Sequence, residues 1–114
     1  MKSELFAQIL AIVAQITELS PEQILSKTKT DDLVAARSLF VHYCASLGVP
    51  SISIARFMQR SWTHSVSRYL ADYNSFSKSS YLFRQMDGRI ASALKPHLLH
   101  NSFTTSSKSS TFAP

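Results

Sequence analysis

The segment from Ile54 to Leu70 constrains this chain most, because it has the pattern of two short helices joined by a tight connection. Apolar side chains recur at helical spacing on one face of each half: Ile54, Phe57 and Met58, then Val66, Tyr69, Leu70 and Tyr73. The connection lacks this periodicity, and it contains Ser61 and Thr63, which are residue types that cap helix N-termini. We therefore predict a helix-turn-helix, with its second helix over residues 62–74.

The outward face of this second helix has the chemistry of a DNA-reading surface. It carries Thr63, His64, Ser67 and Arg68, which are small hydrogen-bonding groups, an imidazole and a guanidinium. Such groups suit phosphates and base edges. The segment therefore predicts a helix that enters the major groove of double-stranded DNA.

The charge of the chain is positive and unevenly distributed. The formal net charge is +5, with −2 over residues 1–24, +3 over residues 25–72 and +4 over residues 73–114. A basic balance of this kind favours an anionic partner such as nucleic acid. The positive field therefore coincides with the predicted reading motif and the segment after it.

Cysteine content and hydropathy indicate in which cellular compartment the protein is expected. Cys44 is the single cysteine, so an internal disulfide and a thiolate metal cluster are excluded, and we expect it to be a small core residue. The apolar N-terminal run is shorter than the roughly 20 residues of a membrane-spanning helix and lacks a clean signal-peptide cleavage site. We expect a cytoplasmic protein without a membrane partner.

The remaining segments also show helical signals, and none shows a strand alternation. We predict an all-α fold of five or six helices, with the helix-turn-helix near its centre. The expected elements beside that motif are helices over residues 3–19, 21–25, 31–47 and about 81–94, a polar break over residues 75–80, and an end or kink at Pro96. Ser20 and Thr30 are the expected caps, and Gly48 the expected C-terminal stop of helix 31–47.

These elements divide the chain into three expected parts. Residues 1–75 form the helix-turn-helix domain, residues 76–100 an additional helix, and residues 101–114 a disordered Ser- and Thr-rich tail. The broad apolar stripe of helix 3–19 favours core packing. A homodimer through the first or last helix remains an alternative.

The segment Leu25–Leu39 resembles the start of the C-terminal DNA-binding domain of the bacterial replication initiator DnaA. Lys27 and Lys29 match that family's basic loop after a leucine-serine pair, and Arg37 matches the arginine of its alanine-arginine helix. Further along, Ile54 to Met58 and Val66 match the scaffold of the family's helix-turn-helix, so the resemblance covers about residues 5–74. It implies a DnaA C-terminal domain-like, Trp repressor-like fold that binds double-stranded DNA.

Two departures from the family shape this expectation. Ser61 to Ser65 replace the family's arginine, aspartate, histidine and two threonines, so we expect a different sequence preference. With only Gly48 and Gly88, the chain has no phosphate-binding glycine-rich loop. The resemblance therefore implies a stand-alone regulator or replication accessory factor without ATPase activity.

Ten residues are predicted to contact DNA. Those in the loop and the helix after it clamp phosphates, and those in the helix-turn-helix reach the groove and its flanking phosphates. They are Lys27, Lys29, Arg37, Arg60, Ser61, Thr63, His64, Ser65, Ser67 and Arg68.

Other chemistry-bearing residues have simpler interpretations. His97 and His100 lack neighbouring ligands for zinc, and Trp62 at the turn is expected to pack on the edge of the core. The aromatic and basic residues of 76–84 more often indicate packing than single-strand binding. We expect no enzymatic activity, cofactor, metal or small-molecule substrate. The rival prediction is a protein-interaction module that keeps the fold but has lost sequence-specific DNA binding.

Overall fold

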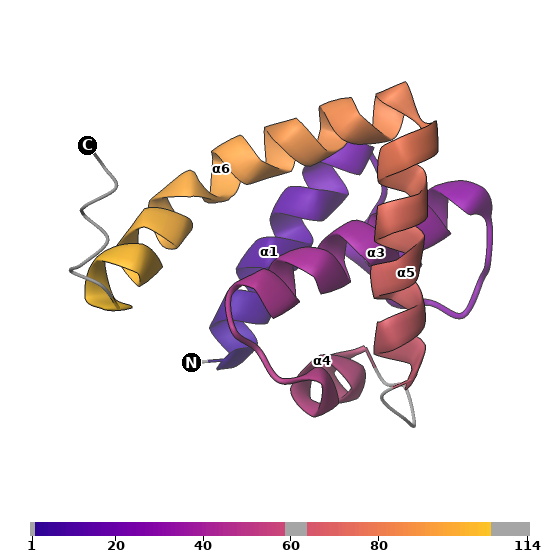
Figure 1. The fold of residues 1–114 in the computed structure, drawn as a ribbon. Coiled ribbons are helices and arrows are strands. Elements are labelled where there is room, and N and C mark those ends of the chain that lie inside the picture. The colour runs from indigo at the N-terminus through magenta and orange to yellow at the C-terminus, as the bar shows by residue number, and fades with distance from the viewer. Residues whose placement is uncertain (1, 59–63, 106–114) are drawn as a thin grey trace.

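The computed structural model describes residues 2–58 and 64–105, and within these ranges the protein is all-α, as predicted. Figure 1 shows α6 lying across one end of the bundle and α4 at the opposite end. The helices are α1 (Lys2–Thr17), α2 (Pro21–Leu25), α3 (Asp31–Ser46), α4 (Ser51–Phe57), α5 (His64–Ser79) and α6 (Tyr81–Thr105).

Helix α3 is the centre of the fold. It runs between α1 and α5 (Figure 1), and its interface with α5 is the largest between any two described helices. Helix α3 is buried on more than one face, because neighbouring helices cover it from several sides. The buried residues of α3 are Leu33, Ala36, Arg37, Ser38, Leu39, Phe40, Val41, Tyr43 and Cys44.

Aromatic side chains connect neighbouring helices at both ends of the bundle. At the α4 end, Phe6 of α1 stacks on Phe57 of α4 with ring centroids 4.5 Å apart, and Phe40 of α3 lies against both. At the α6 end, Phe76 of α5 stacks on the buried Phe83 of α6 at 5.2 Å. These contacts place α4 and α5 on the same core, which fixes the position of the proposed DNA-binding segment.

The ends of α2 and α3 follow the predicted local signals, with one exception. Ser20 and Gln23 form a reciprocal capping box at the start of α2. After α3, Gly48 takes a positive φ of 88°, and the amide of Val49 donates to the carbonyl of Cys44, which closes a Schellman motif. Thr30 occupies the N-cap position of α3, but its hydroxyl donates to Asp32 instead of accepting a backbone amide.

The predicted polar break over residues 75–80 is wrong. Helix α5 continues to Ser79, and Ser80 alone separates it from α6, where its hydroxyl accepts the amide of Phe83 at 3.1 Å. The serine-rich segment stays helical because Phe76 gains a packing partner on α6.

Helix α6 is also longer than predicted. It passes Pro96 and ends at Thr105, so the expectation of disorder is wrong for residues 101–105, whereas 106–114 lie outside the described residues. Its first half packs on α1 and α5, and its second half extends away from the other helices (Figure 1). The predicted division after residue 75 falls inside α5.

Candidate nucleic-acid interface

Helix α5 has an inner face that packs on the core and an outer face that is open to solvent. Val66 is buried, and Tyr69, Leu70 and Tyr73 pack against the same core at the predicted helical spacing. Every exposed side chain of α5 among the described residues is neutral or basic. These side chains are Ser67, Arg68, Ala71, Asn74, Ser75, Lys78 and Ser79, and we call them the α5 outer face.

The α5 outer face contains only part of the predicted reading set. Ser67 and Arg68 are exposed on it, and Ser65 is half-buried at its start. Arg60, Ser61 and Thr63 lie outside the described residues, as does Trp62. His64 begins α5, but its side chain lies outside the described residues.

The same face contains residues that the sequence prediction missed. Ser75 and Lys78 continue the outer face because α5 runs five residues beyond the predicted end of the helix, and Asn74, the last residue of the predicted helix, lies on the same face. The signal was present, since Ser67, Ala71, Asn74 and Lys78 follow one another at steps of four, three and four. The predicted break at Ser75 ended the helix before this pattern reached Lys78.

Arg68 keeps its charge accessible. Its nearest acidic neighbour along the helix is Asp72, one turn later, which is half-buried. Among the described residues, no ion pair joins Arg68 to Asp72 or to another carboxylate. The guanidinium is therefore available to an anionic ligand.

The basic loop before α3 presents two lysines to solvent. Lys27 and Lys29 are exposed, and the loop forms the right-hand edge of the molecule in Figure 1, the side on which α5 also lies. Asp31 and Asp32 follow directly, in the first turn of α3. The hydroxyl of Thr30 lowers the pKa of Asp32 by hydrogen bonding to its carboxylate, so this acid stays ionised and locally opposes the field of the lysines.

The structure contradicts the prediction for Arg37. It was predicted to clamp phosphate, but its side chain has 0% of its surface exposed. Its Nε donates to the carbonyl of Ile24 at 2.6 Å, and its Nη2 donates to the carbonyls of Ser26 at 2.7 Å and Gln23 at 3.3 Å. These bonds satisfy the carbonyls at the C-terminus of α2. Because the guanidinium is buried and bonded to them, Arg37 positions the basic loop instead of contacting DNA.

A second polar cluster joins α3, α5 and α6, and the sequence did not predict it. Tyr73 donates to Oδ2 of Asp87 at 2.6 Å, and Tyr43 donates to Oδ1 of the same carboxylate. Burial, followed by these bonds, raises the pKa of both hydroxyls, that of Tyr73 to about 12, so both remain protonated donors. His42 stacks flat on Tyr73 at 3.6 Å, and its partial burial lowers its pKa despite the opposing charge of Asp87.

This cluster and the remaining titratable groups do not form a metal site within the described residues. No group of three or more histidine, cysteine or carboxylate side chains there could hold an ion. Cys44 is buried, and burial raises its pKa to about 12, so its thiol stays protonated. In the described part of the chain, no helix is both long and apolar enough to cross a membrane.

Comparisons with known proteins identify no relative of this chain. No protein-family model, curated protein or solved structure matches its sequence or its fold.

Proposed function

We propose that the chain binds double-stranded DNA through the α5 outer face. The observation that carries this proposal is that every described exposed side chain of α5 is neutral or basic, with Arg68 and Lys78 as its cations. A continuous surface free of exposed acids is compatible with the closely spaced phosphates of a duplex. The face also offers hydrogen-bonding groups at Ser67, Asn74 and Ser75.

The dimensions and chemistry of α5 suit the major groove. Its 16 residues correspond to about 24 Å of helix, and the groove of B-DNA is about 12 Å wide and admits one helix. Within it, the guanidinium of Arg68 could form a bidentate pair with guanine, and the amide of Asn74 could form one with adenine. Each such pair would provide about 1–3 kcal/mol of discrimination against the wrong base.

The proposed docking arrangement is a helix-turn-helix in which α4 precedes α5. Both helices pack on α3, and α4 contacts α5 directly, which supports a fixed angle between them. Lys27 and Lys29 would contact the phosphate backbone and add affinity without sequence information. This arrangement agrees with the resemblance to the DnaA C-terminal domain, and we extend it to a role as a regulator or accessory factor in transcription or replication.

Binding of a labelled duplex at two salt concentrations tests the proposal. Wild-type protein should bind a mixed-sequence duplex, and binding should weaken steeply as salt rises. Arg68→Ala should weaken binding about tenfold, whereas Arg89→Ala, which removes an exposed arginine from α6, should leave it unchanged. The absence of duplex binding by wild type at low salt would refute the proposal.

A selection from random duplexes then determines whether binding is specific. Enrichment of one sequence by wild type, with relaxation at one base pair in Arg68→Ala, is expected if Arg68 reads a base. Equal recovery of all sequences would restrict the function to backbone binding.

A further inference from the structure

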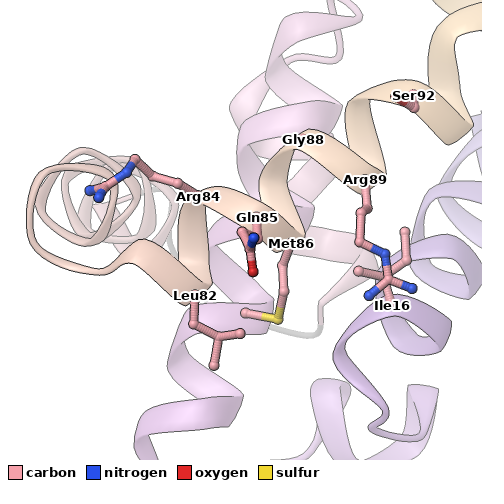
Figure 2. A pocket seen from close by; sticks show the side chains of 8 residues that line it. All are labelled: Ile16, Leu82, Arg84, Gln85, Met86, Gly88, Arg89 and Ser92. Atoms are coloured by element: carbon pink, nitrogen blue, oxygen red, sulfur yellow. The ribbon is translucent and has the colours of Figure 1, made fainter.

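A shallow groove of about 650 Å³ lies beside the first half of α6, on a part of the molecule that the proposed DNA contacts do not use. Figure 2 shows the side chains that line it, most of them from consecutive turns of α6, with Ile16 contributed by α1. The lining residues are Ile16, Leu82, Arg84, Gln85, Met86, Gly88, Arg89 and Ser92.

The groove combines an apolar surface with a basic rim. Leu82, Met86 and Ile16 provide the apolar side chains, and Arg84 and Arg89 provide the cations. No acidic residue is among those that line it. Such a surface could bind a ligand that has both apolar and anionic groups, because it offers apolar contacts and a cation.

Two large apolar side chains at the start of α6 are exposed to solvent. Leu82 has 64% of its surface accessible, and the adjacent Tyr81 has 67%. Both lie in the first turn of α6, directly after Ser80. The next residue, Phe83, is buried in the core. Of the two exposed side chains, Leu82 lines the groove, and an apolar side chain exposed in a groove is typical of an interaction site.

The two arginines of the rim differ in how firmly they are held. Arg84 donates to the carbonyl of Ser77 at 3.0 Å and lies over the ring of Tyr81, so its guanidinium is held toward α5 and points away from Leu82 and Met86 in Figure 2. Arg89 lines the groove together with Ile16 and makes no ion pair among the described residues. A ligand could therefore pair with Arg89 without displacing an internal partner.

We propose that this groove binds an acidic amphipathic helix of a partner protein. Leucine-like side chains of that helix would cover Leu82, Met86 and Ile16, and a carboxylate on its polar face would pair with Arg89. The apolar surface favours a peptide over a nucleic acid, since a phosphate backbone would leave Leu82 uncovered. The site is distinct from the α5 outer face, so it would let the protein recruit a partner while it remains on DNA.

A synthetic peptide tests this proposal. The probe is a fluorescein-labelled amphipathic peptide with leucine at i, i+4 and i+7 and glutamate elsewhere on its polar face. Wild type should bind it, and two control peptides, with lysine for glutamate or serine for leucine, should bind at least about tenfold more weakly. Equal binding of the glutamate and lysine peptides, or no binding, would overturn the proposal.

Matched variants locate the binding site. Leu82→Ser and Arg89→Glu should each weaken the peptide complex about tenfold or more, and because both side chains are exposed, the circular dichroism spectra should be unchanged. Arg56→Glu makes the same charge change on an exposed arginine of α4 and should leave peptide binding intact. An equal effect of Arg56→Glu would show attraction by net charge alone and overturn the site.

Two further readouts distinguish other occupants. If wild type forms a dimer that Leu82→Ser dissociates, a second copy occupies the groove, and the proposal is wrong. If Arg89→Glu weakens duplex binding as much as peptide binding, the groove belongs to the DNA interface. The expected result is a monomer whose duplex affinity is equal in Leu82→Ser and wild type, so failure of the peptide test would leave the DNA proposal standing.

Discussion

The guanidinium of Arg37 in α3 donates to the carbonyl oxygen of Ser26 at 2.7 Å, immediately before the loop that carries Lys27 and Lys29. Its Nε simultaneously donates to Ile24, so one buried side chain holds the end of α2 against α3. The direction of the loop therefore depends on a cation that does not itself reach solvent. In the proposed complex, the two lysines are the groups that contact phosphate, and Arg37 is the group that places them.

Arg37→Lys separates this positioning role from a phosphate contact. A lysine retains the charge but cannot donate to both carbonyls in the same geometry, so carbonyl groups at the end of α2 would lose their partners. We expect the free energy of unfolding to fall by about 2–3 kcal/mol, measured by urea denaturation. Unchanged stability with weakened duplex binding would instead indicate that Arg37 contacts phosphate directly.

Lys27 and Lys29 should affect DNA affinity without affecting the fold. Their side chains are exposed, so Lys27→Ala combined with Lys29→Ala should leave the denaturation midpoint nearly unchanged. The slope of log affinity against log salt should fall in magnitude by about 2, because two phosphate contacts are lost. An Arg89→Ala control should retain the wild-type slope. A double variant with the wild-type slope would exclude the loop from the interface.

His42 should make stability depend on pH. Its pKa is lowered in the folded protein by burial, so below its ordinary value of 6.5 the unfolded chain binds the proton more readily than the native state does. Stability should therefore fall as the pH decreases through about 6.5, and the loss should continue until the folded-state pKa is reached.

The groups that face His42 are Tyr43, Tyr73 and Asp87, and both tyrosines stay protonated in this range. The His42→Phe variant keeps an aromatic ring on Tyr73 and should show a shallower decrease in denaturation midpoint between pH 7 and pH 5 than wild type. An identical pH profile in the variant would contradict this assignment.

The two glycines should respond to alanine in opposite directions. Gly48 has a φ of 88°, which alanine adopts only with strain, so Gly48→Ala should lower the free energy of unfolding by about 1–2 kcal/mol. Gly88 lies inside α6 with no atom within 4 Å of an added Cβ, so Gly88→Ala should raise it by about 0.5–1 kcal/mol. Thermal denaturation of both variants measures this contrast, and shifts in the same direction would contradict it.

Local signals in the sequence predicted the start of α2 and the end of α3 well. The capping box at Ser20 and the stop at Gly48 depend on hydrogen bonds between near neighbours, so residue type and spacing are sufficient to predict them. The inner face of α5 followed from helical periodicity for the same reason.

Predictions that depended on distant packing were less successful. Ser75 to Ser79 have the composition of a break, yet they are helical because Phe76 stacks on Phe83 of the next helix. Arg37 has the sequence appearance of a surface base, and only the position of α2 against α3 shows that its guanidinium has internal acceptors. The Tyr73–Asp87 bond joins residues whose proximity follows from the corner between α5 and α6, which no spacing rule specified.

The most direct test of the account is a titration of ¹⁵N-labelled protein with a duplex, followed by amide chemical shifts. We expect the largest changes along the α5 outer face, from Ser67 to Lys78, and a second set at Lys27 to Lys29. Residues around Leu82 and Arg89 should remain unperturbed. Changes concentrated on α6, or none along α5 at low salt, would contradict the assignment of α5 as the DNA-binding helix.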